Sequence, residues 1–251
     1  MEANEFIFGI RAVIEAIEAG RDVDTIYIKK DLQGDLIKEL LGLIRSRHLP
    51  MRRVPLEKLN KFTRKNHQGV VATLSAVTYS SLGHVITQLY EDGILPLIVV
   101  LDGITDVRNF GAIARTAECC GANAIVIPEH GSVSVQGDAV KTSAGALLRL
   151  PVCREHTVGA AVRFLKDNGF QVVAASEKAD INYTRADYTV PTAIVMGAED
   201  VGIQPGVLEL CDTKVSIPMF GHIGSLNVSV AAGVMLYEVV RQRLESNLEV
   251  I

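Results

Sequence analysis

The sequence predicts an α/β fold with a mainly parallel sheet and helices on both faces, preceded by a smaller α/β unit. Apolar runs of strand length alternate with stretches of helical periodicity along most of the chain. An apolar fraction of 48% with 22% charged residues is typical of an ordinary globular protein. No window approaches the roughly 18 apolar residues of a membrane helix. The acidic start lacks a basic n-region, so we expect a cytoplasmic protein without membrane association.

Residues 1–76 are predicted to form the small domain. Apolar residues at helical spacing predict helices at residues 10–17, before Gly20, and at residues 32–47. β-rich composition predicts strands at residues 25–29, 51–54 and 70–74. Glycine, serine and proline punctuate residues 77–95, which we interpret as a linker that could hold a short helix.

Residues 96–251 are predicted to form the larger domain. Strands are expected at residues 97–101, 124–127, 171–175, 193–196 and 214–217. Helices are expected at residues 109–120, 158–166 and 225–244. This alternation favours parallel strands joined by helical crossovers.

The net charge of −4 argues against a general polyanion binder, but charge is distributed unevenly. Residues 1–78 hold 13 Lys and Arg against 10 Asp and Glu, whereas residues 79–251 hold 12 against 19. Residues 52–65 carry six cations and one carboxylate, a local net charge of +5. Such a segment could neutralise several phosphates of a nucleic acid or could be a solvated surface. The candidate residues for nucleic-acid binding are Arg11, Arg52, Arg53, Lys61, Arg64 and Arg108.

The histidines and cysteines are scattered without metal-ligand spacing. The four cysteines form no C-x-x-C pair, and the six histidines show no H-x-x-x-H pattern. We therefore predict no metal site.

A first candidate site follows the apolar strand at residues 97–101, where open α/β sheets usually place ligands. Asn109 occupies an expected helix N-cap position. Arg115 lies roughly 200° around the helix axis from the apolar Ile113, so it should point away from the core, alongside Arg108. Alternatively, Asn109 only caps the helix and Arg115 pairs with Glu118.

Two further candidate sites lie late in the chain. A predicted strand ends in the G-x-E-x-x-G turn of residues 197–202, whose glycines allow close approach of a ligand. Residues 217–229 then combine a strand end, a glycine-bearing loop and a helix start, with Ser225 as the expected N-cap. Asn227 and Ser229 would lie one turn into an apolar helix, which indicates a ligand-facing or partner-facing role.

Together these segments resemble the three motifs of the SpoU/TrmH family of SPOUT methyltransferases. The match consists of N-x-x-x-x-x-R ending at Arg115, G-x-E-x-x-G at residues 197–202 and I-P-M-x-G with S-L-N-x-S at residues 217–229. Residues 141–146 also match a family segment. The first domain resembles the L30e-like RNA-binding domain of many members, and residues 8–13 and 66–72 are similar to the RlmB type, which modifies a guanosine in large-subunit ribosomal RNA.

The resemblance implies a trefoil-knotted domain, S-adenosylmethionine (AdoMet) as methyl donor, a ribose 2′-hydroxyl of RNA as acceptor, and a homodimer in which two protomers complete each site. It implies cofactor contacts at Gly197, Ile217, Leu226, Met219, Ser176 and Ser225. It also implies catalytic or supporting roles for Arg115, Asn109, Glu199, Ser225 and Asn227.

Arg115 is the residue that we expect to matter most for catalysis. The family proposal makes it the base that activates the 2′-hydroxyl, but a guanidinium stays protonated up to a pKa above about 12. We favour a role in which Arg115 positions the ribose and its phosphate. Methylation of transfer RNA or of another ribosomal site is the nearest alternative, and a non-catalytic RNA-binding adaptor is an alternative of another class.

Overall fold

The computed structural model describes residues 6–246 and divides them into two compact units. The first unit comprises residues 6–78 together with the short segment Ser134–Gly137. The second comprises residues 79–133 and 138–246.

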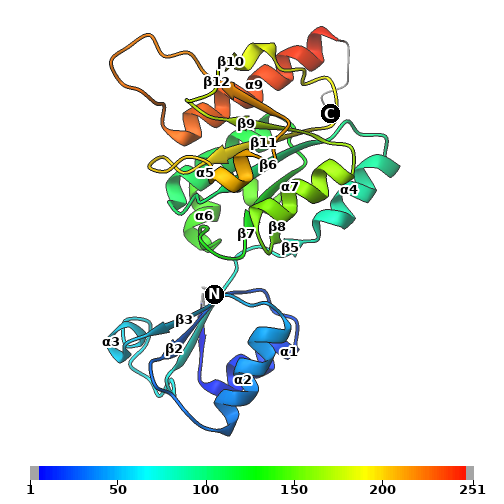
Figure 1. The fold of residues 1–251 in the computed structure, drawn as a ribbon. Coiled ribbons are helices and arrows are strands. Elements are labelled where there is room, and N and C mark those ends of the chain that lie inside the picture. The colour runs from blue at the N-terminus through cyan, green and yellow to red at the C-terminus, as the bar shows by residue number, and fades with distance from the viewer. Residues whose placement is uncertain (1–5, 247–251) are drawn as a thin grey trace. The chain divides into compact units, whose positions relative to one another are not determined.

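The first unit is a four-stranded sheet with two helices on one face (Figure 1). Its elements are β1 (Phe6–Phe8), α1 (Ile10–Glu18), β2 (Val23–Lys29), α2 (Asp35–Ser46), β3 (Met51–Val54), α3 (Leu56–Leu59) and β4 (Val70–Leu74). The strand order is β1-β4-β2-β3, in which β2 and β3 are parallel and the other two pairings are antiparallel. Apolar stripes of α1 and α2 pack on Ile26, Ile28, Val70 and Ala72 because alternate strand residues face the helices.

The second unit contains an eight-stranded sheet in the order β10-β12-β9-β11-β6-β7-β8-β5, and all its strand pairings are parallel. The strands are β5 (Tyr79–Ser80), β6 (Leu97–Asp102), β7 (Ala124–Pro128), β8 (Val152–Glu155), β9 (Gln171–Ala175), β10 (Ile181–Asn182), β11 (Thr192–Gly197) and β12 (Thr213–Ser216). The late strand β12 lies between β9 and β10, so the chain returns to a position between two earlier strands.

Helices cover both faces of this sheet. They are α4 (Leu82–Glu91), α5 (Val107–Cys119), α6 (Gly137–Thr142), α7 (Val158–Asp167), α8 (Pro205–Leu208) and α9 (Val228–Glu245), with 3-10 turns at Ala146–Leu148 and Tyr183–Arg185. Buried side chains of α4, α7 and α8 pack into one core with alternate residues of the strands. Helices α5 and α9 pack against each other, and α9 contacts β11. The expected α/β architecture with a mainly parallel sheet is confirmed.

Several local expectations differ from the structure. Residues 77–95, interpreted as a linker, contain β5 and α4, and Leu82, Ile86 and Leu89 of α4 are core residues of the second unit. Strands β1, β5, β8 and β10 were not predicted, because each has only two to four residues and too few positions to show a periodicity.

The predicted caps of two helices were wrong. Asp106, not Asn109, caps α5, because its Oδ1 accepts hydrogen bonds from the backbone N–H groups of Arg108 and Asn109, at 2.8 and 2.9 Å. Asn227, not Ser225, caps α9, with Oδ1 accepting from the Ser229 N–H at 3.0 Å. Both helices therefore begin at a residue other than the predicted one, and both changes free a side chain for other contacts.

Among residues 6–246, no helix combines the length and apolar character needed to cross a membrane. The same residues contain no cluster of three or more His, Cys, Asp or Glu side chains suited to a metal ion.

Candidate active site

A cavity of about 260 Å³ opens at the carboxyl ends of three neighbouring strands, β9, β11 and β12. Parallel strands of an open sheet end at one edge, which is where such folds bind ligands. The start of α9 closes another side. The lining is mostly apolar, and Glu177, Lys178 and Glu199 contribute charged side chains. This combination suits a ligand with an apolar body and charged groups, such as a nucleoside bearing a sulfonium and an amino acid.

All six residues expected to contact the cofactor line this cavity. They are Ser176, Gly197, Ile217, Met219, Ser225 and Leu226. They come from segments that follow β9, β11 and β12 in the sequence, so only the sheet order brings them together. The cofactor role of each residue stays a prediction.

The glycine turn after β11 is sterically obligatory. A Cβ atom on Gly197 would lie 2.2 Å from the carbonyl carbon of Gly202 and 2.2 Å from the backbone nitrogen of Ile203. The chain folds back onto Gly197 because the Gly202 N–H donates to the Ala198 carbonyl at 2.8 Å, and Gly202 adopts a φ of +70°. The turn therefore presents bare backbone to the cavity.

Asp102 and Gln204 lie outside the cavity lining and hold this turn in place by hydrogen bonds. The sequence analysis missed both residues. Asp102 is 1% exposed at the end of β6, where it pairs with Gly197 of β11. Its two carboxylate oxygens accept hydrogen bonds from the Gln204 backbone N–H and from Gln204 Nε2, each at 2.7 Å. A carboxylate that ends an otherwise apolar strand was the available signal, because a buried charge requires partners.

Glu199 joins the three motifs. Its Oε1 accepts hydrogen bonds from Asn109 Nδ2 at 3.2 Å, from the Val228 backbone N–H at 3.2 Å and from Asn227 Nδ2. Asn227 Nδ2 also donates to Asn109 Oδ1 at 2.9 Å. The carboxylate thus lies at the N-terminus of α9, where the helix dipole favours negative charge. The sequence indicated these three residues separately but not their contact.

Ser225 lies in the loop before α9 and lines the cavity without capping the helix. Asn227 serves instead as cap, and Ser229 Oγ donates to Asn227 Oδ1 at 2.5 Å. The polar residues that looked misplaced in an apolar helix therefore orient the Asn227 amide toward Glu199 and Asn109.

Arg115 does not reach the cavity of its own chain. Its side chain is exposed on α5 and forms no hydrogen bond or ion pair with another residue among 6–246, so the suggested pairing with Glu118 is absent there. Arg108 is exposed on the same helix and also lies outside the cavity lining. Gly111 lets α5 pack closely on the end of α6, because a Cβ on Gly111 would lie 2.6 Å from the Thr142 Cβ.

The other candidate RNA-binding residues belong to the first unit, and all are exposed. Arg11 Nη1 lies 3.8 Å from Glu39 Oε1 in an ion pair between α1 and α2. Arg52 and Arg53 lie on β3, and Lys61 and Arg64 follow α3.

Comparison with known proteins assigns both units. The model of the SpoU rRNA methylase family matches residues 96–237, and the model of the RNA 2′-O ribose methyltransferase substrate-binding domain matches residues 6–80. The chain belongs to the SpoU methylase family. Both units therefore have family counterparts, and the family is one of AdoMet-dependent RNA methyltransferases.

Relatives within the SpoU family match nearly the whole chain. A putative TrmH family tRNA/rRNA methyltransferase of Staphylococcus saprophyticus is 35% identical over 237 residues, covering 94% of this chain and 95% of the relative. The SpoU methyltransferase AviRb from Streptomyces viridochromogenes, solved with AdoMet, has a TM-score of 0.61 at 28% identity, covering 96% and 90%. An AdoMet-bound rRNA methyltransferase from Sinorhizobium meliloti has a TM-score of 0.57 at 25% identity, covering 94% and 86%.

Proposed function

We propose that this SpoU-family enzyme transfers a methyl group from AdoMet to a ribose 2′-hydroxyl of RNA, at a guanosine of large-subunit ribosomal RNA as in the RlmB type. The contact of Glu199 with both Asn109 and Asn227 carries the proposal, because it brings all three motifs to the rim of one cavity. The match of residues 6–80 to a 2′-O ribose methyltransferase substrate-binding domain supports the choice of acceptor.

Different lining residues bind different parts of the methyl donor AdoMet. Backbone groups at Gly197, Ile217 and Leu226 bind its polar edges, Met219 provides apolar contact, and Ser176 and Ser225 offer hydroxyls. AdoMet supplies a methyl group on a cationic sulfur. Glu199 holds Asn109 and Asn227 in one orientation at the rim, where a ribose would approach.

Arg115 acts in the cavity of a second copy of the chain. It is exposed and free of partners among residues 6–246, and it lies on α5 outside its own cavity lining. A protonated guanidinium there would bind the phosphate next to the target ribose and stabilise negative charge that develops on the 2′-oxygen. The protein is thus a homodimer with C2 symmetry, in the cytoplasm with its ribosomal RNA substrate.

Two alternatives are tested alongside. A solved TrmH/SpoU tRNA-modifying enzyme of A. aeolicus is 32% identical but covers 66% of this chain, so transfer RNA is the second candidate substrate. The ribosomal choice is favoured because the S. meliloti rRNA methyltransferase matches both units, over 94% of the chain. A non-catalytic adaptor is disfavoured because Asn109, Arg115 and the S-L-N segment of residues 225–227 are all present.

The test is to locate the methyl group. Total ribosomal and transfer RNA from a deletion strain is incubated with the protein and labelled AdoMet, then digested and analysed by mass spectrometry. We expect label in an alkali-resistant dinucleotide of large-subunit RNA, because alkaline cleavage needs a free 2′-hydroxyl. Label on a base, or in transfer RNA alone, would contradict the proposal. AdoMet binding without any transfer would support the adaptor.

A further inference from the structure

The two faces of the small sheet in the first unit are covered very differently. On the face beneath α1 and α2, the central side chains Ile26, Ile28, Val70 and Ala72 are each 0% exposed. Among the described residues of this unit, the four-residue helix α3 and the residues after it lie against the opposite face (Figure 1). Four aromatic side chains on that side are half-buried, so the face is not sealed from solvent: Phe6, Phe8, Tyr27 and Phe62.

These four residues form a continuous aromatic surface, which we call the aromatic face. The ring centroids of Tyr27 and Phe62 are 5.0 Å apart, those of Phe6 and Phe62 are 6.0 Å apart, and those of Phe6 and Phe8 are 6.3 Å apart. Val54, Leu59 and Val71 support the rings from within. Because the four aromatic residues are only half-buried, part of their surface is available to a partner.

Cations border the aromatic face. Lys58 Nζ lies 5.6 Å from the centroid of the Tyr27 ring. Arg52 of the edge strand β3 is paired with Tyr27 of β2, so the two side chains project from the same face. Neither Arg52 nor Lys58 forms an ion pair with another residue in the described part of the chain. Their charges are therefore available to an anionic partner.

The neighbouring Arg53 points the other way. Side chains alternate along a strand, and Met51, two residues before Arg53, packs into the core beneath α1 and α2. Val54, two residues after Arg52, belongs to the core under the aromatic rings. Arg52 and Arg53, which the sequence suggested together for RNA binding, therefore project from opposite faces of the sheet. Only Arg52 lies beside the aromatic face, so in this proposal Arg53 has no RNA contact and is a matched control for Arg52.

We infer that the aromatic face binds RNA through unpaired bases, which stack on the Tyr27–Phe62 pair while Arg52 and Lys58 contact the adjoining phosphates. The inference rests on the proposed RNA substrate and adds the surface and the form of RNA that it takes. Base-paired RNA hides its base faces, whereas looped or single strands expose them to aromatic side chains. A purely electrostatic site would need the cations without the rings.

The experiment compares full-length variants in RNA binding without cofactor, by fluorescence anisotropy over a range of salt concentrations. The probes are oligouridylate and an RNA duplex of equal length. We expect Phe62→Leu to weaken oligouridylate binding about tenfold with an unchanged salt slope, because only stacking is lost. Phe62→Tyr should retain affinity. Arg52→Gln should reduce the salt slope by about 0.7, and Arg53→Gln should leave it unchanged.

Equal binding by Phe62→Leu and the wild type, equal slopes for Arg52→Gln and Arg53→Gln, or tighter binding of the duplex would overturn the inference. A change of oligomeric state in Phe62→Leu would also overturn it, since the face would then bind a second copy. Thermal unfolding of each variant identifies a folding defect, which Phe62→Tyr avoids by keeping the ring. This binding assay contains no AdoMet, so its result does not depend on methyl transfer. If the labelling experiment found the methyl group on a base, the proposed function would be refuted while the inference about the aromatic face would still stand.

Discussion

The two ends of α9 use polar side chains for different purposes. At the N-terminal end, Asn227 caps the helix and donates to Glu199 of the turn after β11 and to Asn109 of α5, whose side chains lie partly in solvent at the cavity rim. At the C-terminal end, Gln242 and Arg243 donate to backbone carbonyls of other segments. Polar groups satisfied by one another at a rim are available to a ligand, whereas groups satisfied by buried backbone are committed to the fold.

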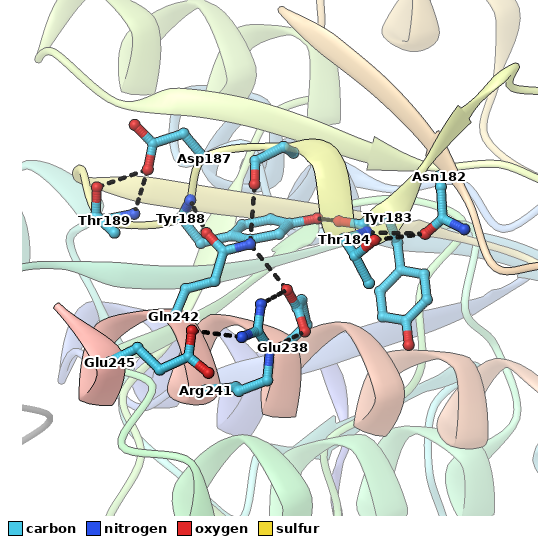
Figure 2. Close-up of polar contacts among 11 residues, drawn as sticks. Asn182, Tyr183, Thr184, Asp187, Tyr188, Thr189, Glu238, Arg241, Gln242 and Glu245 are labelled. Carbon is cyan, nitrogen blue, oxygen red and sulfur yellow. Dashed lines mark hydrogen bonds and ion pairs between the residues drawn. The ribbon is translucent and has the colours of Figure 1, made fainter.

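Side chains at the C-terminal end of α9 form hydrogen bonds with the segment between β10 and β11, as Figure 2 shows. Gln242 Oε1 accepts from the Tyr188 N–H at 3.0 Å, and its Nε2 donates to the Ala186 carbonyl at 3.0 Å and to Glu238 Oε1 at 2.8 Å. Arg241 forms a two-bond pair with Glu238, at 2.7 and 2.8 Å, and this pairing lowers the pKa of Glu238.

Arg243 carries a buried positive charge, which requires several hydrogen-bond acceptors. It is 3% exposed and donates to the carbonyls of Leu95, Pro96, Tyr188 and Val190 at 2.8 to 3.2 Å. Burial lowers the pKa of Arg243 to about 10, which leaves it protonated near neutral pH. One guanidinium therefore ties the end of α9 to the residues before β6 and β11.

The largest expected effect is the loss of methyl transfer. It tests the contacts at the N-terminal end of α9 together with Arg115 of a second copy of the chain. Arg115→Ala and Glu199→Ala should each abolish methyl transfer, while Arg115→Ala keeps cofactor binding nearly intact by calorimetry. If each site combines the cavity of one protomer with Arg115 of another, unfolding and refolding the two variants together should restore about a quarter of wild-type activity in a symmetric dimer. A mixture that stays inactive would place the whole site in one chain, and turnover by Arg115→Ala alone would remove its catalytic role.

At the C-terminal end, Arg243→Met should lower the free energy of unfolding by about 3 kcal/mol or more, because buried carbonyls lose their donors. The measurement is urea denaturation followed by circular dichroism. Arg163→Met, which removes an exposed arginine of α7, serves as control and should unfold nearly as the wild type does. If both variants unfold alike, the C-terminal end of α9 does not stabilise the fold as argued.

The smallest expected effect is a difference in stability that distinguishes the N-cap residue Asn227 from the nearby Ser225. Asn227→Ala should cost about 1 kcal/mol of stability because α9 loses its N-cap. Ser225→Ala should change stability by less than about 0.5 kcal/mol, because Ser225 is exposed and does not cap the helix. Thermal unfolding of the two variants checks the assignment, and the reverse order would restore Ser225 as the cap.

Sequence alone determined the main elements and the motif residues of this protein. The apolar runs at β6, β9 and β11 and the stripes of α1, α2 and α7 are local patterns, since burial on one side leaves a periodic record in the chain. Asn109, Glu199, Asn227 and the cavity-lining glycine turn were recognised from spacing and from the family resemblance. Short strands and the two caps were missed because a few residues carry no periodicity and several polar side chains compete for one helix end.

Only the tertiary structure decided which of these residues meet. Asn109 and Asn227 are 118 positions apart, and their contact follows from the order in which β9, β11, β6 and β12 assemble, which no local pattern encodes. The same holds for the pairing of Asp102 with Gln204 and for Arg52 beside Tyr27. Strand order and register place distant side chains together, because parallel strands joined by crossovers bring their ends to one edge whatever their separation in sequence.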